Sequence, residues 1–439
     1  MKKYFISGAM LAGLMSLAAC SNDEDVVADN NGAEQQFTIT LASSGDRATR
    51  AAADRTLESE AAGQSIEKVT LVVRSQDDNK VVYIHTLDNW NGTATDYDTN
   101  GHGKKLTFTI PKADKLGEGK YVVTAVGYNE GNYNLKLPAK GDVVDKNITA
   151  ITPADAEAKE VFAGEQKFSV SADKKIEGTD ASKAIQSVDV TLHRQVAGAY
   201  GYFTSIPAKI GETDVASIRM VSRSKNTVLT FGSFNSSFTT TDANVMYMVN
   251  GSVPATKTAK FLNGDEANVL FSAKIADWFP GGDEYKDGVY DKKDTNWTNP
   301  YTTGSYLKGS VFASNFIVPF SATQGKSTLE LQLLDATGNV LYAWPVKLDA
   351  SNDQISKTGE TASADLFGAG TAMGFAETAD VFSLFRNHIY SIGIHKQGTT
   401  NPDKTDPGTD EPTDLSKIQN VVIRVNDNWE ALHHMSIDE

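Results

Sequence analysis

The sequence predicts a mainly all-β protein with two tandem β-sandwich domains and few short helices. Three observations support this fold class. Apolar and polar residues alternate with a period of two in many short segments, helical periodicity is scarce, and turn sequences such as WNGT (90–93) and PGGD (280–283) recur. Many strands without a strand–helix–strand rhythm favour sandwiches with antiparallel or Greek-key pairing over an α/β fold.

The alternation places most of the expected strands. In FTITL, Phe37, Ile39 and Leu41 share one face of the strand, with threonines on the other. The same pattern predicts strands at 105–110, 187–192 and 328–333, and longer apolar runs predict covered strands at 67–75, 119–128, 312–320 and 339–348. Pro319 and Pro345 indicate strand edges or ends. The segment 152–162 predicts a helix that Thr152 would cap.

Composition excludes several classes of protein. The chain has 439 residues, enough for two domains with real cores, and its net charge of −15 argues against nucleic acid as a partner. Its one cysteine, Cys20, excludes an intrachain disulfide and a multi-thiolate metal site. No segment after the N-terminal one has the roughly 18 apolar residues needed to span a bilayer, so we expect a soluble body.

The N-terminus is typical of an export signal. Lys2 and Lys3 precede an apolar run, and LAAC (17–20) resembles the lipobox of bacterial lipoproteins, which predicts a signal peptide over 1–20 and a lipidated, palmitate-bearing Cys20. The alternative is an ordinary secretory signal. The acidic SNDEDVV that follows resembles a surface-export signal of Bacteroidetes lipoproteins, and the alternative is a solvated tether.

No catalytic motif, cofactor fingerprint or metal-binding cluster is recognisable, so the sequence predicts neither an enzyme nor a resident cofactor. The loop 283–294 is a poor match to a calcium loop because Tyr285 stands where a ligand is expected. Trp90, Trp278 and Trp297 lie near loops, where they could stack on sugars or cover the ends of a sandwich.

Two unusual segments flank the predicted sandwiches. SGDRATRAAADRT (44–56) carries Arg47, Arg50 and Arg55 among small residues, so it should be open to proteases, and cutting there would detach FTITL. Near the C-terminus, a spacer rich in Pro, Asp and Thr (399–414) leads to two segments of strand-like alternation, NVVIRV and LHHMSID. Their apolar stripes consist of Val421, Ile423 and Val425, and of Met435 and Ile437.

The order of these parts resembles the fimbrillins, the major fimbrial subunits of Bacteroidetes, and in particular the FimA-like stalk pilins of type V pili. The resemblance covers essentially the whole chain and implies Greek-key, transthyretin-like sandwiches. The strand SVDVTLHRQVA ends near residue 195, before the turn GAYGYF, which predicts two sandwich domains at 51–195 and 196–397. With the resemblance, we expect a signal peptide (1–20), a propeptide with a removable strand (21–50), these two domains, and a linker with donor strands (398–439).

The resemblance also implies a mechanism of assembly. An Arg-specific protease would cut after Arg50, with Arg47 and Arg55 as alternatives, and would remove the strand that contains Phe37, Ile39 and Leu41. The two C-terminal strands would then enter the groove of an identical or related pilin, giving a head-to-tail filament at the cell surface. The precursor would be anchored in the outer membrane by lipid, and the filament would serve adhesion.

Other functions remain open from sequence alone. A fimbrial tip would not need a donating tail, and an anchor would not need cleavage. A glycan-binding surface lipoprotein would use the tryptophans and would treat the tail as a small hairpin. Of the two tail strands, NVVIRV has the better apolar alternation, and we expect both to run along the neighbour.

Overall fold

The computed structural model describes residues 34–41, 66–96, 104–131, 133–144, 149–153, 158–177, 187–223, 225, 229–231, 259–283, 287–301, 306–320, 327–348, 382, 384, 389–395, 411–417 and 421–426. Within them the regular secondary structure is almost entirely β-strand, as the alternation predicts. The described helical elements are one turn or less: α1 (Trp90–Thr93), the 3₁₀ turn η2 (Lys112–Asp114) and α3 (Ile275–Trp278). No described helix is long and apolar enough to cross a membrane.

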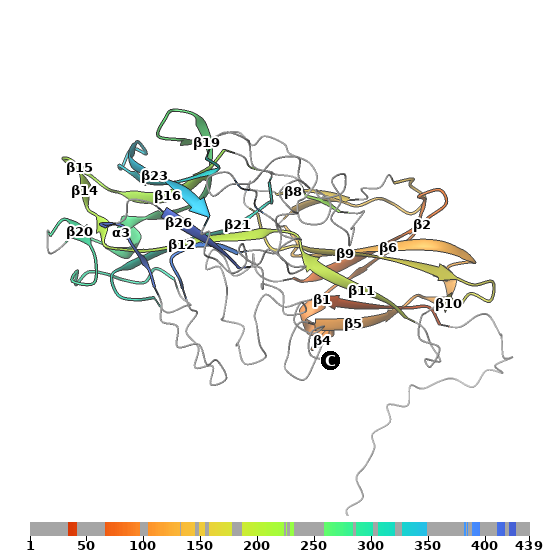
Figure 1. Ribbon diagram of the computed structural model, residues 1–439. Coiled ribbons are helices and arrows are strands. Elements are labelled where there is room, and N and C mark those ends of the chain that lie inside the picture. Colours follow the sequence, from red (N-terminus) through yellow and green to blue (C-terminus); the bar gives the residue numbers. More distant parts are fainter. Residues whose placement is uncertain are drawn as a thin grey trace, which may run out of the picture.

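Figure 1 shows two lobes side by side, each built around its own sheet system. The strands of the first lobe follow the order β3-β2-β6-β9-β11-β1-β5-β4, with β10 added to β9. Their bounds are β1 (Gln36–Leu41), β2 (Lys68–Ser75), β3 (Val81–Leu87), β4 (Thr95–Asp96), β5 (Lys104–Thr109), β6 (Gly119–Tyr128), β9 (Phe162–Val170), β10 (Ile176–Glu177) and β11 (Ser187–Arg194).

The first lobe is a sandwich because its sheet folds over at β11. Strand β11 pairs with β9 only at His193 and Arg194, and the rest of β11 pairs with β1. Gly164 of β9 makes this close crossing possible, since a Cβ there would lie 1.9 Å from the backbone oxygen of Thr191. Apolar side chains from both layers, including Phe37, fill the space between them.

The second lobe uses the strands after residue 196. Their order is β18-β19-β16-β22-β23-β26-β24-β12-β21, with β25 added to β12. The bounds are β12 (Ala197–Thr204), β16 (Ser217–Ser222), β18 (Ala259–Lys260), β19 (Glu266–Lys274), β21 (Ser310–Ile317), β22 (Leu329–Leu334), β23 (Val340–Leu348), β24 (Ile389–Ile392), β25 (Thr413–Asp414) and β26 (Val421–Asn426).

Short pairings complete the fold. Two-stranded ribbons join β13 (Ile206–Pro207) to β20 (Val289–Tyr290) and β14 (Lys209–Ile210) to β15 (Thr213–Asp214). A three-stranded sheet, β17-β8-β7, links the lobes, since β8 (Thr149–Pro153) pairs with β7 (Tyr133–Lys136) and with β17 (Leu229–Phe231). The predicted helix at 152–162 is therefore wrong where it is described: Thr152 and Pro153 belong to β8, and their pairing with β7 overrides the local helix signal.

The junction between the lobes is rigidly packed. An apolar cluster here combines first-lobe residues such as Val126 with second-lobe residues such as Phe316. Beside it, the Arg194 guanidinium donates from Nε to Glu160 Oε1 at 2.9 Å, and both side chains are almost completely buried. The Arg194 guanidinium also lies 4.9 Å from the centre of the Phe162 ring. A junction made this way favours one fixed orientation of the two lobes.

Candidate functional site at strands β1 and β26

Strand β1 occupies an interior position in its layer. It pairs in parallel with β11 over six positions, from Gln36↔Ser187 to Leu41↔Leu192, and antiparallel with β5 over the same six residues. Both of its backbone edges are therefore used. Without β1, the edges of β11 and β5 that now face it would lose their partners, and unpaired edges are ready to accept another strand.

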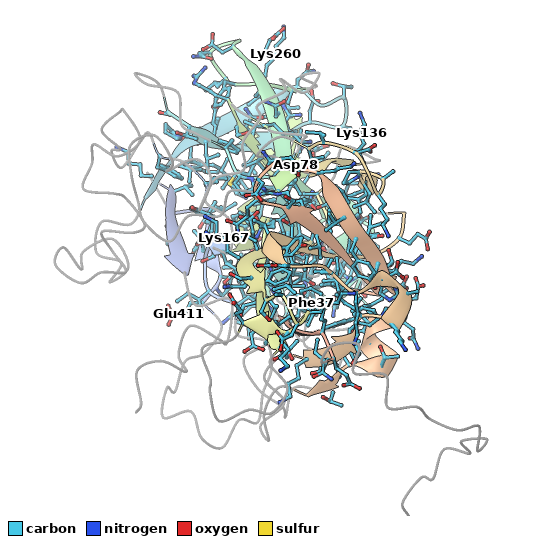
Figure 2. The ribbon with its side chains drawn as sticks, turned by 90° about the vertical axis from the view of Figure 1, so that its right-hand side faces the viewer. Phe37, Asp78, Lys136, Lys167, Lys260 and Glu411 are labelled. Atoms are coloured by element: carbon cyan, nitrogen blue, oxygen red, sulfur yellow. The ribbon has the colours of Figure 1, made fainter. Side chains whose placement is uncertain are left out.

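The inward face of β1 is part of the core of the first lobe. Phe37 and Ile39 are fully buried, and Leu41 is 8% exposed. The Phe37 ring meets the Phe168 ring edge-to-face, with centroids 5.5 Å apart. Figure 2 shows Phe37 among the densely packed side chains of this lobe. The outward face is polar, and Thr38 Oγ1 lies 3.1 Å from Thr107 Oγ1. The alternation in the sequence thus identified the buried face.

A residue that the sequence analysis missed fixes the start of β1. Gln35 is fully buried, and its side-chain Nε2 donates to the carbonyl oxygens of Leu116 and Lys174, each at 2.9 Å. In return, the Leu116 N–H donates to Gln35 Oε1 at 2.8 Å. We call this arrangement the Gln35 clamp. Its position in the sequence could have indicated its burial, because Gln35 continues the series of inward-facing residues 37, 39 and 41.

The C-terminal strand β26 lies in the other lobe (Figure 1). Its first three residues pair in parallel with β23, from Val346↔Val421 to Leu348↔Ile423, and its last three pair antiparallel with β24. Val421 is fully buried in the core of the second lobe. The predicted tail strand NVVIRV is thus a strand that packs on its own chain in this conformation.

The two six-residue strands are held to different extents. Each residue of β1 has a partner on both sides, whereas within the described part of the chain each residue of β26 has one partner, from β23 or from β24. Pro345, which the sequence places at a strand edge or end, lies inside β23 opposite Glu330 of β22, and the position that would face it from the β26 side, 420, is outside the described residues. Backbone pairing therefore restrains β26 less than it restrains β1.

Several predicted site residues fall outside the described part of the chain: Cys20, Arg47, Arg50, Arg55, Met435 and Ile437. For Ile423 and Val425 the structure describes the backbone pairing of β26 and not the side chains.

The sugar-stacking interpretation of the tryptophans is wrong for two of the three. Trp90 is fully buried and Trp278 is 1% exposed, so neither ring offers a face to a ligand. Trp297 packs against Trp278 and donates its Nε1 proton to the Ser310 carbonyl oxygen at 2.7 Å. Trp90 thus packs in the core of the first lobe, and Trp278 and Trp297 pack in the core of the second, as large apolar side chains ordinarily do.

The acidic loop at 283–294 is organised by protein contacts. The Lys293 ammonium lies 2.5 Å from Asp287 Oδ2, and this ion pair holds the pKa of Asp287 below its usual range. Asp294 accepts a hydrogen bond from the Asp291 backbone N–H at 2.8 Å. Within the described ranges, no three His, Cys, Asp or Glu side chains gather as metal ligands would.

Comparison with known proteins gives structural neighbours only. No protein-family model matches the chain, and neither does any curated protein. Among solved structures, a Bacteroides thetaiotaomicron protein proposed to be an adhesin is similar at a TM-score of 0.39 and 10% identity, covering 90% of this chain and 97% of that one.

Fimbrial proteins are also among these neighbours. A fimbrial assembly protein from Parabacteroides distasonis has a TM-score of 0.35 and 12% identity, covering 83% of this chain and 92% of that one. The fimbrial anchor protein Mfa2 from Porphyromonas gingivalis has a TM-score of 0.33 and 10% identity, with coverages of 84% and 93%. All three TM-scores lie below 0.5, so the likeness is distant.

Proposed function

We propose that the protein is a structural fimbrial subunit of the stalk type. In this proposal it is exported as a lipoprotein precursor, lipidated at Cys20, and cut by an Arg-specific protease after Arg50 or a neighbouring arginine. The mature subunits then polymerise by strand exchange into surface fimbriae that serve adhesion. Sandwich domains over 51–195 and 196–397 form the body, consistent with the change of sheet between β11 and β12.

The observation that carries the proposal is the position of β1. It is an interior strand of a folded lobe, yet the stretch that follows it in sequence, 42–65, holds three arginines among small residues. Cleavage there would leave β1 attached by noncovalent contacts alone. Burial of Phe37, Ile39 and Leu41 contributes roughly 4.5–9 kcal/mol at about 1.5–3 kcal/mol each, so a replacement strand must bring comparable side chains.

The C-terminal strand has the properties of such a replacement. It has the β-branched alternation of Val421, Ile423 and Val425, and backbone pairing restrains it less than β1 in the same chain. The end of the spacer that precedes it forms β25 on β12, and the earlier part, 399–410, has the composition of an extended linker. Because the groove and the donor lie on different lobes, exchange between copies is heterologous and head-to-tail, which builds filaments when it does not close.

The test is cleavage of the purified full-length precursor with an Arg-specific protease, followed by gel filtration and electron microscopy. We expect polymer after cleavage. The matched control replaces Arg47, Arg50 and Arg55 by Gln and should stay monomeric. A second variant lacks residues 416–439 and should be cut without polymerising. Cleavage of the wild-type chain without polymer, or polymer from the truncated chain, would refute the proposal.

The alternative role is that of a fimbrial anchor, and mass spectrometry of the N-terminus distinguishes an anchor from a stalk subunit. An anchor would keep β1 and its lipid, so mass spectrometry of surface material would find Cys20 lipidated and the arginine stretch uncut. A stalk subunit would begin at Ala51 or at the residue after another of the three arginines. A tip subunit would be cut but would not need the tail.

A further inference from the structure

The Gln35 clamp satisfies backbone groups of Leu116 and Lys174 that would need new hydrogen-bond partners if β1 left. Three hydrogen bonds join the Gln35 amide to the backbone of Leu116 and Lys174, at distances of 2.8–2.9 Å. Leu116 is 5% exposed, so water has little access to its N–H and carbonyl groups. If β1 leaves, these groups lose their partner, and a buried polar group without a partner is costly.

Only certain side chains meet this requirement. A primary amide offers two donor hydrogens and one acceptor oxygen, which is the set the clamp uses. A neutral imidazole offers one donor and one acceptor on a rigid ring, and an apolar side chain offers none. A strand that replaces β1 is therefore favoured if it carries Gln at the position of Gln35.

The spacing from the clamp to the apolar pockets sets the register. Gln35 stands two, four and six residues before Phe37, Ile39 and Leu41, and the strand alternation turns all four side chains inward. In the tail, Gln419 stands two, four and six residues before Val421, Ile423 and Val425. The two segments, QQFTITL and QNVVIRV, run in the same direction and share Gln and Ile at equivalent positions.

The other tail segment lacks this match. Aligning Met435 and Ile437 with Phe37 and Ile39 places His433 at the clamp position. The segment 186–192 has the same spacing of Gln and apolar residues, but its strand β11 is itself one wall of the groove. Of the two tail segments, only Gln419–Val425 fits both the clamp and the pockets.

We propose that residues Gln419–Val425 of a second copy take the register of Gln35–Leu41, with the Gln419 amide bound to the Leu116 and Lys174 backbone. This inference rests on the proposed strand exchange and adds to it the inserted segment, its register and the residue that selects it. A one-residue slip of the inserted strand would turn its apolar side chains away from the core. A two-residue slip would place a residue other than Gln419 at the clamp position, so the clamp groups would lack an amide partner.

The test is competition by synthetic peptides during assembly of the protease-cut full-length chain. A peptide of residues 417–428 should fill the groove and block polymer formation. The Gln419→Leu peptide should require about tenfold to hundredfold more to block assembly to the same degree, because it leaves the clamp groups unpaired. The Asn420→Leu peptide is the matched control and should act like the wild type, since that side chain faces outward.

The outcomes separate this inference from the proposed function. If the cut chain forms no polymer, the proposed function fails. If polymer forms but the Gln419→Leu peptide blocks as well as the wild type, the clamp is not the selecting feature and the inference fails. The inference is also overturned if polymer forms and a peptide of residues 430–439 blocks assembly better than residues 417–428.

Discussion

Phe37→Ala should destabilise the precursor and leave the assembled filament unchanged. In the precursor Phe37 is fully buried, and its ring meets Phe168 edge-to-face at 5.5 Å. Removing such a side chain costs about 3–5 kcal/mol, which includes the cavity left behind. For a lobe of this size, about 2–4 °C per kcal/mol gives a fall of about 6–20 °C in the melting temperature of the first lobe.

The assay is scanning calorimetry on the uncut precursor and on filaments made from it after cleavage. Thr38→Ala is the matched control on the same strand. It removes one exposed hydroxyl that faces Thr107 and should cost no more than about 1 kcal/mol. The proposed removal of β1 predicts that filaments from Phe37→Ala and wild-type precursors melt alike. Filaments weakened by Phe37→Ala would refute that removal, and a precursor with unchanged melting would refute the burial of Phe37.

Three further predictions follow from the described contacts. Arg194→Met should lower the free energy of unfolding by about 3–5 kcal/mol in denaturant titrations, because it removes the cation of a buried ion pair and leaves the Glu160 charge uncompensated by Arg194. Adding Glu160→Met should recover part of the loss. Burial raises the pKa of Tyr133 above its ordinary value of 10.0. The stability that the neutral phenol contributes to the folded protein is therefore fully present below about pH 10 and is lost as pH rises further. In melting curves between pH 8 and 11, this loss of stability should be shallower for Tyr133→Phe than for the wild type. In the assembly competition, the Val421→Phe peptide of residues 417–428 should block about fivefold more strongly than the wild type, because the pocket of Phe37 is larger than valine fills; equal blocking would argue against that register.

In the proposed exchange, the same size difference would keep the tail from displacing β1 in an intact precursor. The segment Phe37, Ile39, Leu41 fills the pockets better than Val421, Ile423, Val425, and it is covalently attached until the arginine stretch is cut. In the proposed exchange, the cut segment with β1 must first dissociate. The C-terminal strand of another subunit, present at high local concentration during assembly, would then bind in its place.

The sequence predicted the strands well because period-two alternation reports directly on which side chains are buried. FTITL shows this, since all three of its inward residues lie in the core. The segment 152–162 misled because a capping threonine and a proline are local signals, whereas β8 owes its conformation to pairing with the preceding strand β7 and with β17, which is distant in sequence.

The site was only partly predictable for a related reason. Alternation assigns a face to a strand but does not name its partner, so the pairing of β26 with β23 and β24 in its own lobe could not be inferred from NVVIRV. Gln35 was missed because a polar residue at the start of a strand is usually solvated, and its burial depends on loops around Leu116 and Lys174.

Disulfide trapping in assembled filaments tests the central claim most directly. In the precursor, Thr38 lies opposite Thr107 of β5, so residue 422 of the incoming tail should take the place of Thr38. Filaments of the Thr107→Cys, Val422→Cys variant should oxidise to a ladder of covalent oligomers on a non-reducing gel. Thr107→Cys with Ile423→Cys is the control and should give no ladder, because residue 423 faces the core. Filaments that form normally without a 107–422 crosslink, or that crosslink through 423 instead, would contradict the exchange of the tail for β1.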